Sequence, residues 1–255
     1  MQPTSAPRQS VHMARFPRLD LPGIPQHLVQ RGNNRLPCFL DDEDRTRYQQ
    51  LLGGALRATG CQLHAYVLMD NHVHLLATPP EPGALGKMMQ KLGRQYVGLF
   101  NARHGRTGTL WEGRYKACLV DGADYLLRCV RYIDLNPVRA RMTDDPTAFA
   151  WSSCASLCGL REDPLLTLHP IQHALGHAAY RALLTEALND EDLAAIRAYL
   201  QQQRAYGRDD FRAMVEAKTK RFAGVRPAHR PVKSTSLGVS EPDPVLPRPR
   251  SKHSR

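Results

Sequence analysis

Two histidines separated by a single residue, His72 and His74, are the side chains of this sequence best suited to chemistry. Apolar residues on both sides of the polar pair Asp70-Asn71 predict two short strands joined by a turn. Residues i and i+2 of a strand project from the same face, so both imidazoles should point at one spot. Two imidazoles form half of a divalent-metal site, and the third ligand must come from another part of the chain.

A later segment offers a phenol and an amide at helical spacing. Residues 123–136 predict a helix, which Pro137 should stop. Tyr132 and Asn136 are four residues apart, so their side chains should share one helix face. The carbonyl oxygen of Asn136 is an acceptable ligand for Mg²⁺ or Mn²⁺. A phenol is a poor nucleophile at the reference tyrosine pKa of about 10, unless a neighbouring cation helps to remove its proton.

The elements that must position these residues follow from the hydrophobic pattern. Strands are expected at 26–31, 61–69, 72–78 and 115–120, and helices at 41–60, 84–103 and 123–136. This order of strands and helices predicts an α+β fold, with an antiparallel sheet and helices over one or both of its faces.

Composition limits the partners and the compartment. The 255 residues carry 35 Lys+Arg against 24 Asp+Glu, a formal net charge of +11. This excess favours a polyanionic partner, either nucleic acid or an anionic membrane surface, and nucleic acid is the preferred interpretation. No apolar run approaches the length of a spanning helix, and the first residues do not form a secretory signal. The six scattered cysteines fit reduced thiols, so we expect a cytoplasmic, nucleoid-associated protein.

Four segments can be distinguished along the chain. Residues 1–14 and the Pro- and Arg-rich residues 225–255 should be disordered, because neither segment can bury enough apolar surface. The patterned region 15–160 should form the main domain, and residues 165–224 a helical extension. The extension could be a DNA-contacting appendage or a cap on the sheet, and the sequence leaves both open.

Together these motifs resemble a known family. His-hydrophobic-His on a strand, followed by Tyr-x-x-x-Asn-Pro on a helix, resembles the single-tyrosine HUH transposases of the IS200/IS605 type. The resemblance is closer to their chromosomal relatives, the REP-associated tyrosine transposases, which also have Asn where the transposon-borne enzymes have Gln. Matching blocks occur in the family's order at 31–35, 64–69, 100–108, 111–116, 135–140 and 151–153.

The resemblance implies a fold and a reaction. The fold would be a ferredoxin-like antiparallel sheet with packed helices. His72, His74 and Asn136 would bind a divalent metal, Mg²⁺ or Mn²⁺, and Tyr132 would be the nucleophile. The substrate would be single-stranded DNA with hairpin or repeat ends, cleaved and rejoined through a 5′-phosphotyrosine. Members of the family act as homodimers or as monomers.

Basic and aromatic residues near these blocks are candidate DNA contacts, with Trp111 as a possible stacking platform. They are Arg31, Asn33, Arg35, Arg103, Arg106, Trp111, Arg114 and Lys116. Two other functions fit part of the pattern. A DNA-binding protein derived from such a transposase would keep the fold and charge without catalysis, and a hydrolase of small phosphoesters would leave the net charge unexplained.

Overall fold

The computed structural model describes residues 18–226, and these residues fold around one five-stranded sheet. The predicted disordered segments, 1–14 and 225–255, lie outside the described residues except for 225 and 226. The strands are β1 (Gln26–Arg31), β2 (Gln62–Met69), β3 (His72–Thr78), β4 (Lys116–Val120) and β5 (Ala205–Tyr206). The helices are η1 (Asn33–Arg35), α1 (Asp42–Thr59), α2 (Ala84–Arg103), α3 (Ala123–Asp134), α4 (Asn136–Arg139), η2 (Pro146–Ala148), α5 (Cys154–Leu157), α6 (Pro170–Leu184), α7 (Asp190–Gln202) and α8 (Asp209–Thr219).

The sheet confirms the predicted fold class. Its strand order is β2-β3-β1-β4-β5, and the first six long elements follow the β-α-β-β-α-β order of a ferredoxin-like fold. The pairs β2–β3, β3–β1 and β1–β4 are antiparallel, as expected. The prediction missed β5, which pairs in parallel with β4, because its two residues are too short to give a pattern of their own.

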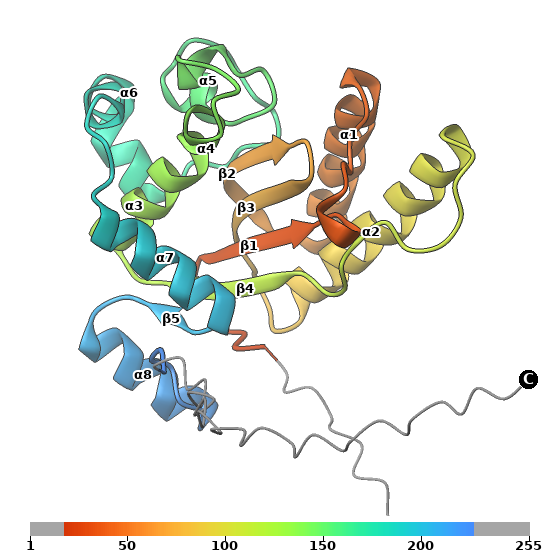
Figure 1. Ribbon diagram of the computed structural model, residues 1–255. Helices are drawn as coiled ribbons and strands as arrows, with labels where there is room; N and C mark the ends of the chain where they lie inside the picture. The colour runs from red at the N-terminus through yellow and green to blue at the C-terminus, as the bar shows by residue number, and fades with distance from the viewer. Residues whose placement is uncertain (1–17, 227–255) are drawn as a thin grey trace, which may run out of the picture. The chain divides into compact units, whose positions relative to one another are not determined.

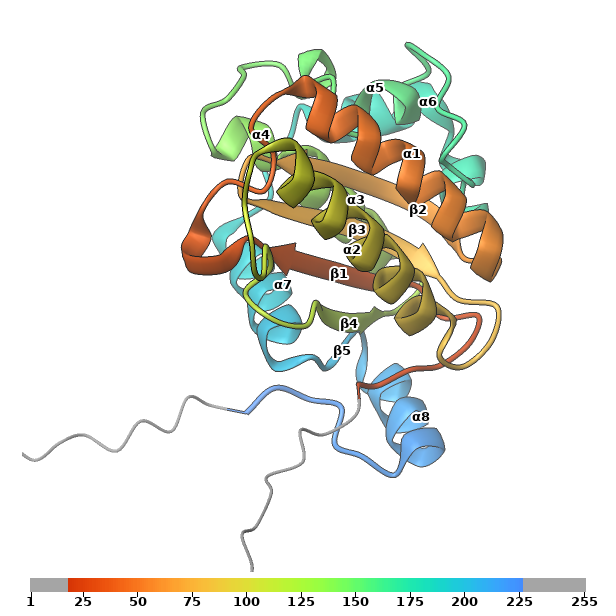
Figure 2. The same ribbon diagram turned by 90° about the vertical axis from the view of Figure 1, so that its right-hand side faces the viewer.

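Helices cover both faces of the sheet. On one face, α1 and α2 lie side by side across the strands (Figure 2) and pack on apolar residues such as Leu28 and Leu75. On the other face, α3 and α7 lie over the strands, with α6 beyond them (Figure 1). The second core includes Leu126, Val130 and Ile133 of α3, which the helical spacing predicted to face inward. Each face of the sheet therefore has its own core.

The segment 165–224 caps the sheet and also extends it. Ile196 and Leu200 of α7 and Tyr180 of α6 are buried in the same core as α3. The strand β5 adds to the edge at β4, and α8 packs beyond it through Phe211 and Val215. Of the two alternatives that the sequence left open, packing against the sheet is the arrangement observed.

Local sequence signals explain how α1 begins and ends. The Asp41 side chain accepts a hydrogen bond from the Asp44 backbone N–H at 3.0 Å, and three acidic residues occupy the first turn. Both features satisfy the exposed N–H groups and the positive end of the helix dipole. The helix ends at Thr59, and Gly60 after it adopts the left-handed conformation at φ 66°, where glycine is not strained.

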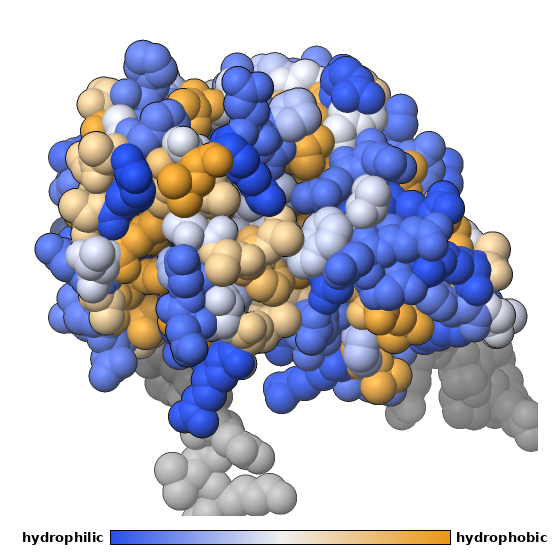
Figure 3. Space-filling model, turned by 90° about the horizontal axis from the view of Figure 1, so that it is seen from above, coloured by the Kyte–Doolittle hydropathy of each residue, from blue (hydrophilic) through white to orange (hydrophobic). Residues whose placement is uncertain are grey.

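The outer surface mixes polar and apolar residues. Seen from above, hydrophilic residues dominate one side of the molecule, and apolar residues are interspersed on the other (Figure 3). None of the helices between residues 18 and 226 is long and apolar enough to cross a membrane.

Candidate active site

The two candidate metal ligands share the sheet face that α3 and α7 cover. Strand β3 pairs His72 with Arg31 and His74 with Val29 of β1. Directly paired residues of antiparallel strands project to the same side, so Arg31 and both histidines lie on one face. The two imidazole centroids are 5.0 Å apart, with their ring planes at 82°. The prediction that both imidazoles point to one region is therefore met by the geometry.

The orientation of His72 is fixed by its neighbour in the turn. His72 Nδ1 lies 2.7 Å from Asn71 Oδ1, and Asn71 Nδ2 donates to the Arg35 carbonyl oxygen at 3.1 Å. Because the amide oxygen can only accept, His72 must carry its proton on Nδ1, which leaves the lone pair on Nε2. Burial, with a smaller contribution from Arg31, lowers the pKa of His72 to about 4. The ring is therefore neutral at physiological pH, the form that binds a metal.

His74 is held by a histidine that the sequence analysis did not select. His27 of β1 places its Nε2 2.9 Å from His74 Nδ1, and the exposed fractions of the two residues are 0% and 3%. Burial lowers the pKa of His27 to about 3, and it also lowers the pKa of His74 well below its ordinary value. Both rings are neutral, and one N–H lies between them.

The helix that carries Tyr132 ends earlier than predicted. Its last residue is Asp134, and a separate short helix, α4, starts at Asn136 with Pro137 in its first turn. A proline ring clashes with the carbonyl group one turn earlier and has no N–H, so a continuous helix through position 137 is disfavoured. The Tyr132 carbonyl oxygen instead accepts hydrogen bonds from Asn136 Nδ2, at 2.9 Å, and from the guanidinium of Arg139. These hydrogen bonds at the helix break connect Tyr132, Asn136 and Arg139.

The phenol ring of Tyr132 lies against the strand histidines. Its centroid is 5.6 Å from that of His74 and 5.7 Å from that of His27, in edge-on contacts. The exposed fraction of Tyr132 is 6%. The guanidinium carbon of Arg139 lies 4.5 Å from the ring centroid. Burial lowers the pKa of Arg139 to about 10, partly offset by Tyr132, so the side chain is a cation at neutral pH.

The donor set fits a hard or borderline divalent cation. Within residues 18–226, no cluster of three His, Cys, Asp or Glu side chains could hold a metal, so a site at the two histidines would need a ligand of another type. Asn136 could hold a cation through its amide oxygen, because its Nδ2 already donates to the Tyr132 carbonyl oxygen. Two neutral imidazoles and an amide oxygen suit Mn²⁺ and accept Mg²⁺.

Four of the candidate DNA contacts line one basic pocket, here called the basic groove. It has a volume of about 350 Å³, and its basic residues are Arg31, Arg35, Arg114 and Lys116, together with Glu112 and Gln201. The loop before β4 forms one wall, because the Glu112 N–H donates to the Arg31 carbonyl oxygen at 2.9 Å. Lys116 pairs with Val29, which itself pairs with His74, so the basic groove opens on the sheet face of the histidines.

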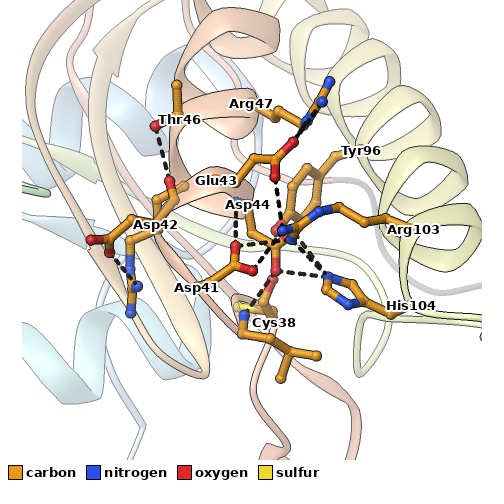
Figure 4. Close-up of polar contacts among 12 residues, drawn as sticks. Cys38, Asp41, Asp42, Glu43, Asp44, Thr46, Arg47, Tyr96, Arg103 and His104 are labelled. Carbon is orange, nitrogen blue, oxygen red and sulfur yellow. Dashed lines mark hydrogen bonds and ion pairs between the residues drawn. The ribbon is translucent and has the colours of Figure 1, made fainter.

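Arg103 is placed elsewhere, which corrects its assignment as a DNA contact. Its guanidinium reaches from the end of α2 to three carboxylates at the start of α1 (Figure 4). The contacts are 2.6 Å to Asp41, 2.9 Å to Glu43 and 2.7 Å to Asp44. With its charge satisfied by three acids, Arg103 joins two helices rather than presenting a cation to a phosphate.

The position of Trp111 also differs from the predicted one. Its exposed fraction is 6%, and its ring packs in the core under α1 and α2, 6.1 Å from the ring of Tyr96. A base cannot stack on a ring that is already covered, so Trp111 is not a stacking platform in this structure. The remaining two candidates do not line the basic groove. Arg106 packs over Phe100, and the Asn33 backbone N–H bonds the Leu110 carbonyl oxygen.

The topology and the sequence together classify the chain. The sheet order defines an α+β domain of ferredoxin-like type. Residues 22–136 match the model of the family described as "Transposase IS200 like". The matched segment contains both strand histidines and Tyr132, and it ends at Asn136. This match confirms the resemblance to IS200-like transposases that was inferred from the sequence.

Two solved structures are similar to the chain. One is a REP-associated tyrosine transposase bound to a REP hairpin, with 17% identity, 62% of this chain and 93% of that chain covered, and a TM-score of 0.49. The other is a candidate transposase from Deinococcus radiodurans R1, with 21% identity, 55% and 92% covered, and a TM-score of 0.33. Among curated proteins, none matches the sequence. The family match and the site geometry, rather than these two likenesses, support the function proposed below.

Two residues of the site were not selected from the sequence. His27 lies in a strand segment where a single histidine carries no spacing signal. Arg139 follows Pro137 by two residues, and one signal could have identified it. A phenol nucleophile needs a nearby cation, and position 139 is the first basic residue after Tyr132.

Proposed function

We propose that this chain is a metal-dependent transposase that binds hairpin-containing single-stranded DNA and cleaves and rejoins it through Tyr132. The observation that carries the proposal is the convergence of groups distant in the sequence. The phenol ring of Tyr132 lies 5.6 Å from the ring of His74, which belongs to a different element 58 positions earlier. The family match of residues 22–136 supports the same reaction class.

The metal site would be built from three side chains of this chain. His72 and His74 would bind through Nε2, and Asn136 through its amide oxygen. When bound, the cation would polarise the scissile phosphate and neutralise charge on its non-bridging oxygens. Asn71 holds one imidazole in the ligating tautomer, and the hydrogen bond to the Tyr132 carbonyl holds the amide. The protein thus orients its ligands before the cation arrives.

Tyr132 would form the covalent link to DNA. Its oxygen attacks the phosphorus atom, and the bond between phosphorus and the 3′ oxygen breaks. The phenolic proton passes to water, and the departing 3′ oxygen takes a proton from water. One phosphodiester replaces another, so no nucleotide cofactor is consumed, and the reverse step rejoins the strand. Arg139, 4.5 Å from the ring, would stabilise the negative phenolate.

The basic groove would guide the strand to this site. Arg31, Arg35, Arg114 and Lys116 would neutralise successive phosphates. Arg31 is the direct cross-strand neighbour of His72, so a phosphate bound at the inner end of the groove would lie next to the metal ligands. Phosphoryl transfer depends mainly on such positioning.

One observation favours a second candidate function. Tyr132 has an exposed fraction of 6%, and a phosphate must reach its hydroxyl for cleavage to occur. A protein that binds DNA hairpins through the basic groove but does not cleave them would keep this tyrosine as a core residue. The two functions differ in whether a covalent adduct forms.

A labelled single-stranded oligonucleotide carrying a hairpin separates the two functions. The transposase predicts cleavage and a protein–DNA adduct that require Mn²⁺ or Mg²⁺ and disappear with EDTA. Tyr132→Phe should abolish both products while the gel-shift affinity stays within about threefold. Tyr125→Phe is the matched control, since Tyr125 lies on the same helix but packs against Tyr206 at 4.8 Å. Binding without any adduct in the wild-type protein would favour the second candidate.

A further inference from the structure

The hydrogen bond between His27 and His74 connects two imidazoles whose roles differ. The two residues lie on neighbouring strands but are not direct partners, since β1 and β3 pair His27 with Leu76 and His74 with Val29. The bond therefore runs diagonally across the sheet, at 2.9 Å between His27 Nε2 and His74 Nδ1. Both rings are buried, so water does not compete for either nitrogen.

A single proton between two neutral imidazoles can be held in two ways. If His74 Nδ1 carries it and donates to His27, the second nitrogen of His74, Nε2, keeps its lone pair. If His27 Nε2 carries it and donates to His74, then His74 must hold its own proton on Nε2. Only the first arrangement lets His74 bind a metal through Nε2.

His27 has a second unusual feature, because its other nitrogen has no partner. Among the described residues, His27 Nδ1 is a buried polar atom without a hydrogen bond. An unpaired buried polar atom destabilises the fold, and an apolar side chain would fill this place without that penalty. The histidine is therefore better explained by what its Nε2 does for His74 than by packing.

The two candidate ligands are supported in the same manner. Asn71 Oδ1 accepts from Nδ1 of His72, and His27 Nε2 is placed to accept from Nδ1 of His74. In each case a protein acceptor on Nδ1 would leave Nε2 free. Such partners of metal-bound histidines fix both the ring orientation and the tautomer.

We propose that His27 is a positioning residue that holds His74 in the tautomer with a free Nε2 and thereby raises the affinity of the site for a divalent cation. This inference rests on the proposed function, since it takes His74 as a ligand. His27 itself does not contact the cation. Its contribution requires an acceptor at the position of Nε2 and does not require an aromatic ring.

Two substitutions separate the acceptor from the ring. His27→Phe keeps a ring beside Tyr132 but removes the acceptor, whereas His27→Gln keeps an acceptor and removes the ring. We expect Mn²⁺ binding, measured by calorimetry on the purified full chain, to weaken about 10- to 100-fold in His27→Phe. In His27→Gln it should stay within about threefold of the wild type. His64→Phe, which alters a buried histidine bonded to Thr78 and Thr167, should leave Mn²⁺ binding unchanged.

A spectroscopic measurement tests the tautomer without metal. Ring ¹⁵N shifts of His74 should show the proton on Nδ1 in the wild type and in His27→Gln, and a mixture of tautomers in His27→Phe. Thermal unfolding and DNA gel shifts verify the fold of each variant, and His27→Leu replaces the phenylalanine variant if that chain does not fold.

The outcomes distinguish this inference from the proposed function. Wild-type Mn²⁺ affinity in His27→Phe, together with lost affinity in His72→Ala, would overturn the role of His27 and leave the metal site standing. Equal weakening in His27→Phe and His27→Gln would also overturn it, because the acceptor would then not matter. Unchanged Mn²⁺ affinity in His72→Ala would refute the metal site itself and this inference with it.

Discussion

Removing the Arg139 charge tests whether a partly buried cation activates the phenol. The guanidinium carbon lies 4.5 Å from the Tyr132 ring centroid, and the tyrosine is 6% exposed. Two unit charges at this separation interact by about 1 kcal/mol in water and by about 4 kcal/mol at an effective dielectric constant of 20. The phenol oxygen keeps only part of its negative charge in the transition state, so Arg139 stabilises that state by only part of this energy. We therefore expect Arg139→Gln to slow cleavage about 10- to 1,000-fold.

The assay is single-turnover formation of the covalent adduct, with saturating DNA and Mn²⁺, followed from pH 6 to pH 10. Without the cation, the negative charge on the phenol oxygen loses its stabilisation in the transition state, so Arg139→Gln should be slower than the wild type at every pH tested. Arg139→Lys is the matched control, because it keeps the charge and loses the planar fork. It should recover most of the rate.

Arg139 also donates a hydrogen bond to the Tyr132 carbonyl oxygen, so a loss of rate could come from a displaced helix. Thermal unfolding and Mn²⁺ affinity distinguish the two causes, since displacement of this segment would also move Asn136. Arg139→Gln with a wild-type rate of adduct formation would refute the electrostatic role of Arg139.

Two further predictions concern DNA binding and stability. Single-stranded DNA binding should weaken in each of the variants Arg31→Ala, Arg114→Ala and Lys116→Ala, and the slope of log affinity against log salt should fall by about 0.7. Arg103→Ala should leave this slope unchanged. Equal slopes in all four variants would contradict DNA binding by the basic groove. Burial lowers the pKa of His64 to about 4, so its contribution to stability is full above the unfolded value of 6.5 and is lost as the pH falls towards 4. Between pH 7 and pH 4, the free energy of unfolding of His64→Gln should therefore fall less than that of the wild type, by up to about 3 kcal/mol in urea titrations. If the two free energies fall in parallel, His64 does not cause this pH dependence.

Short-range patterns predicted the parts of this structure that depend on one element at a time. The strand alternation around His72 and His74 and the helical spacing of α2 were sufficient to locate both elements, and α2 spans the predicted residues 84–103. Pro137 indicated the end of the helix that carries Tyr132. Pro137 did not indicate that Asn136 would begin a new helix, because the start of that helix depends on which groups donate hydrogen bonds to the Tyr132 carbonyl oxygen.

Contacts between distant elements could not be obtained from the same patterns. Arg103 and Trp111 looked like DNA contacts because they are basic or aromatic residues in a polar region. Their positions depend on partners far away in the sequence. Arg103 binds carboxylates at the start of α1, about 60 positions earlier, and Trp111 packs against Tyr96, about 15 positions earlier. His27 illustrates the same limit, since its partner His74 lies 47 positions away on another strand.

The position of Tyr132 bears on how many chains one active site needs. Its ring meets His74 and His27 of the same chain, and Asn136 and Arg139 are bonded to its own carbonyl group. Asn136 and Arg139 lie within seven residues of Tyr132, so a movement of the tyrosine backbone would break their hydrogen bonds to its carbonyl oxygen. The phenol and the strand histidines that it contacts therefore come from one chain.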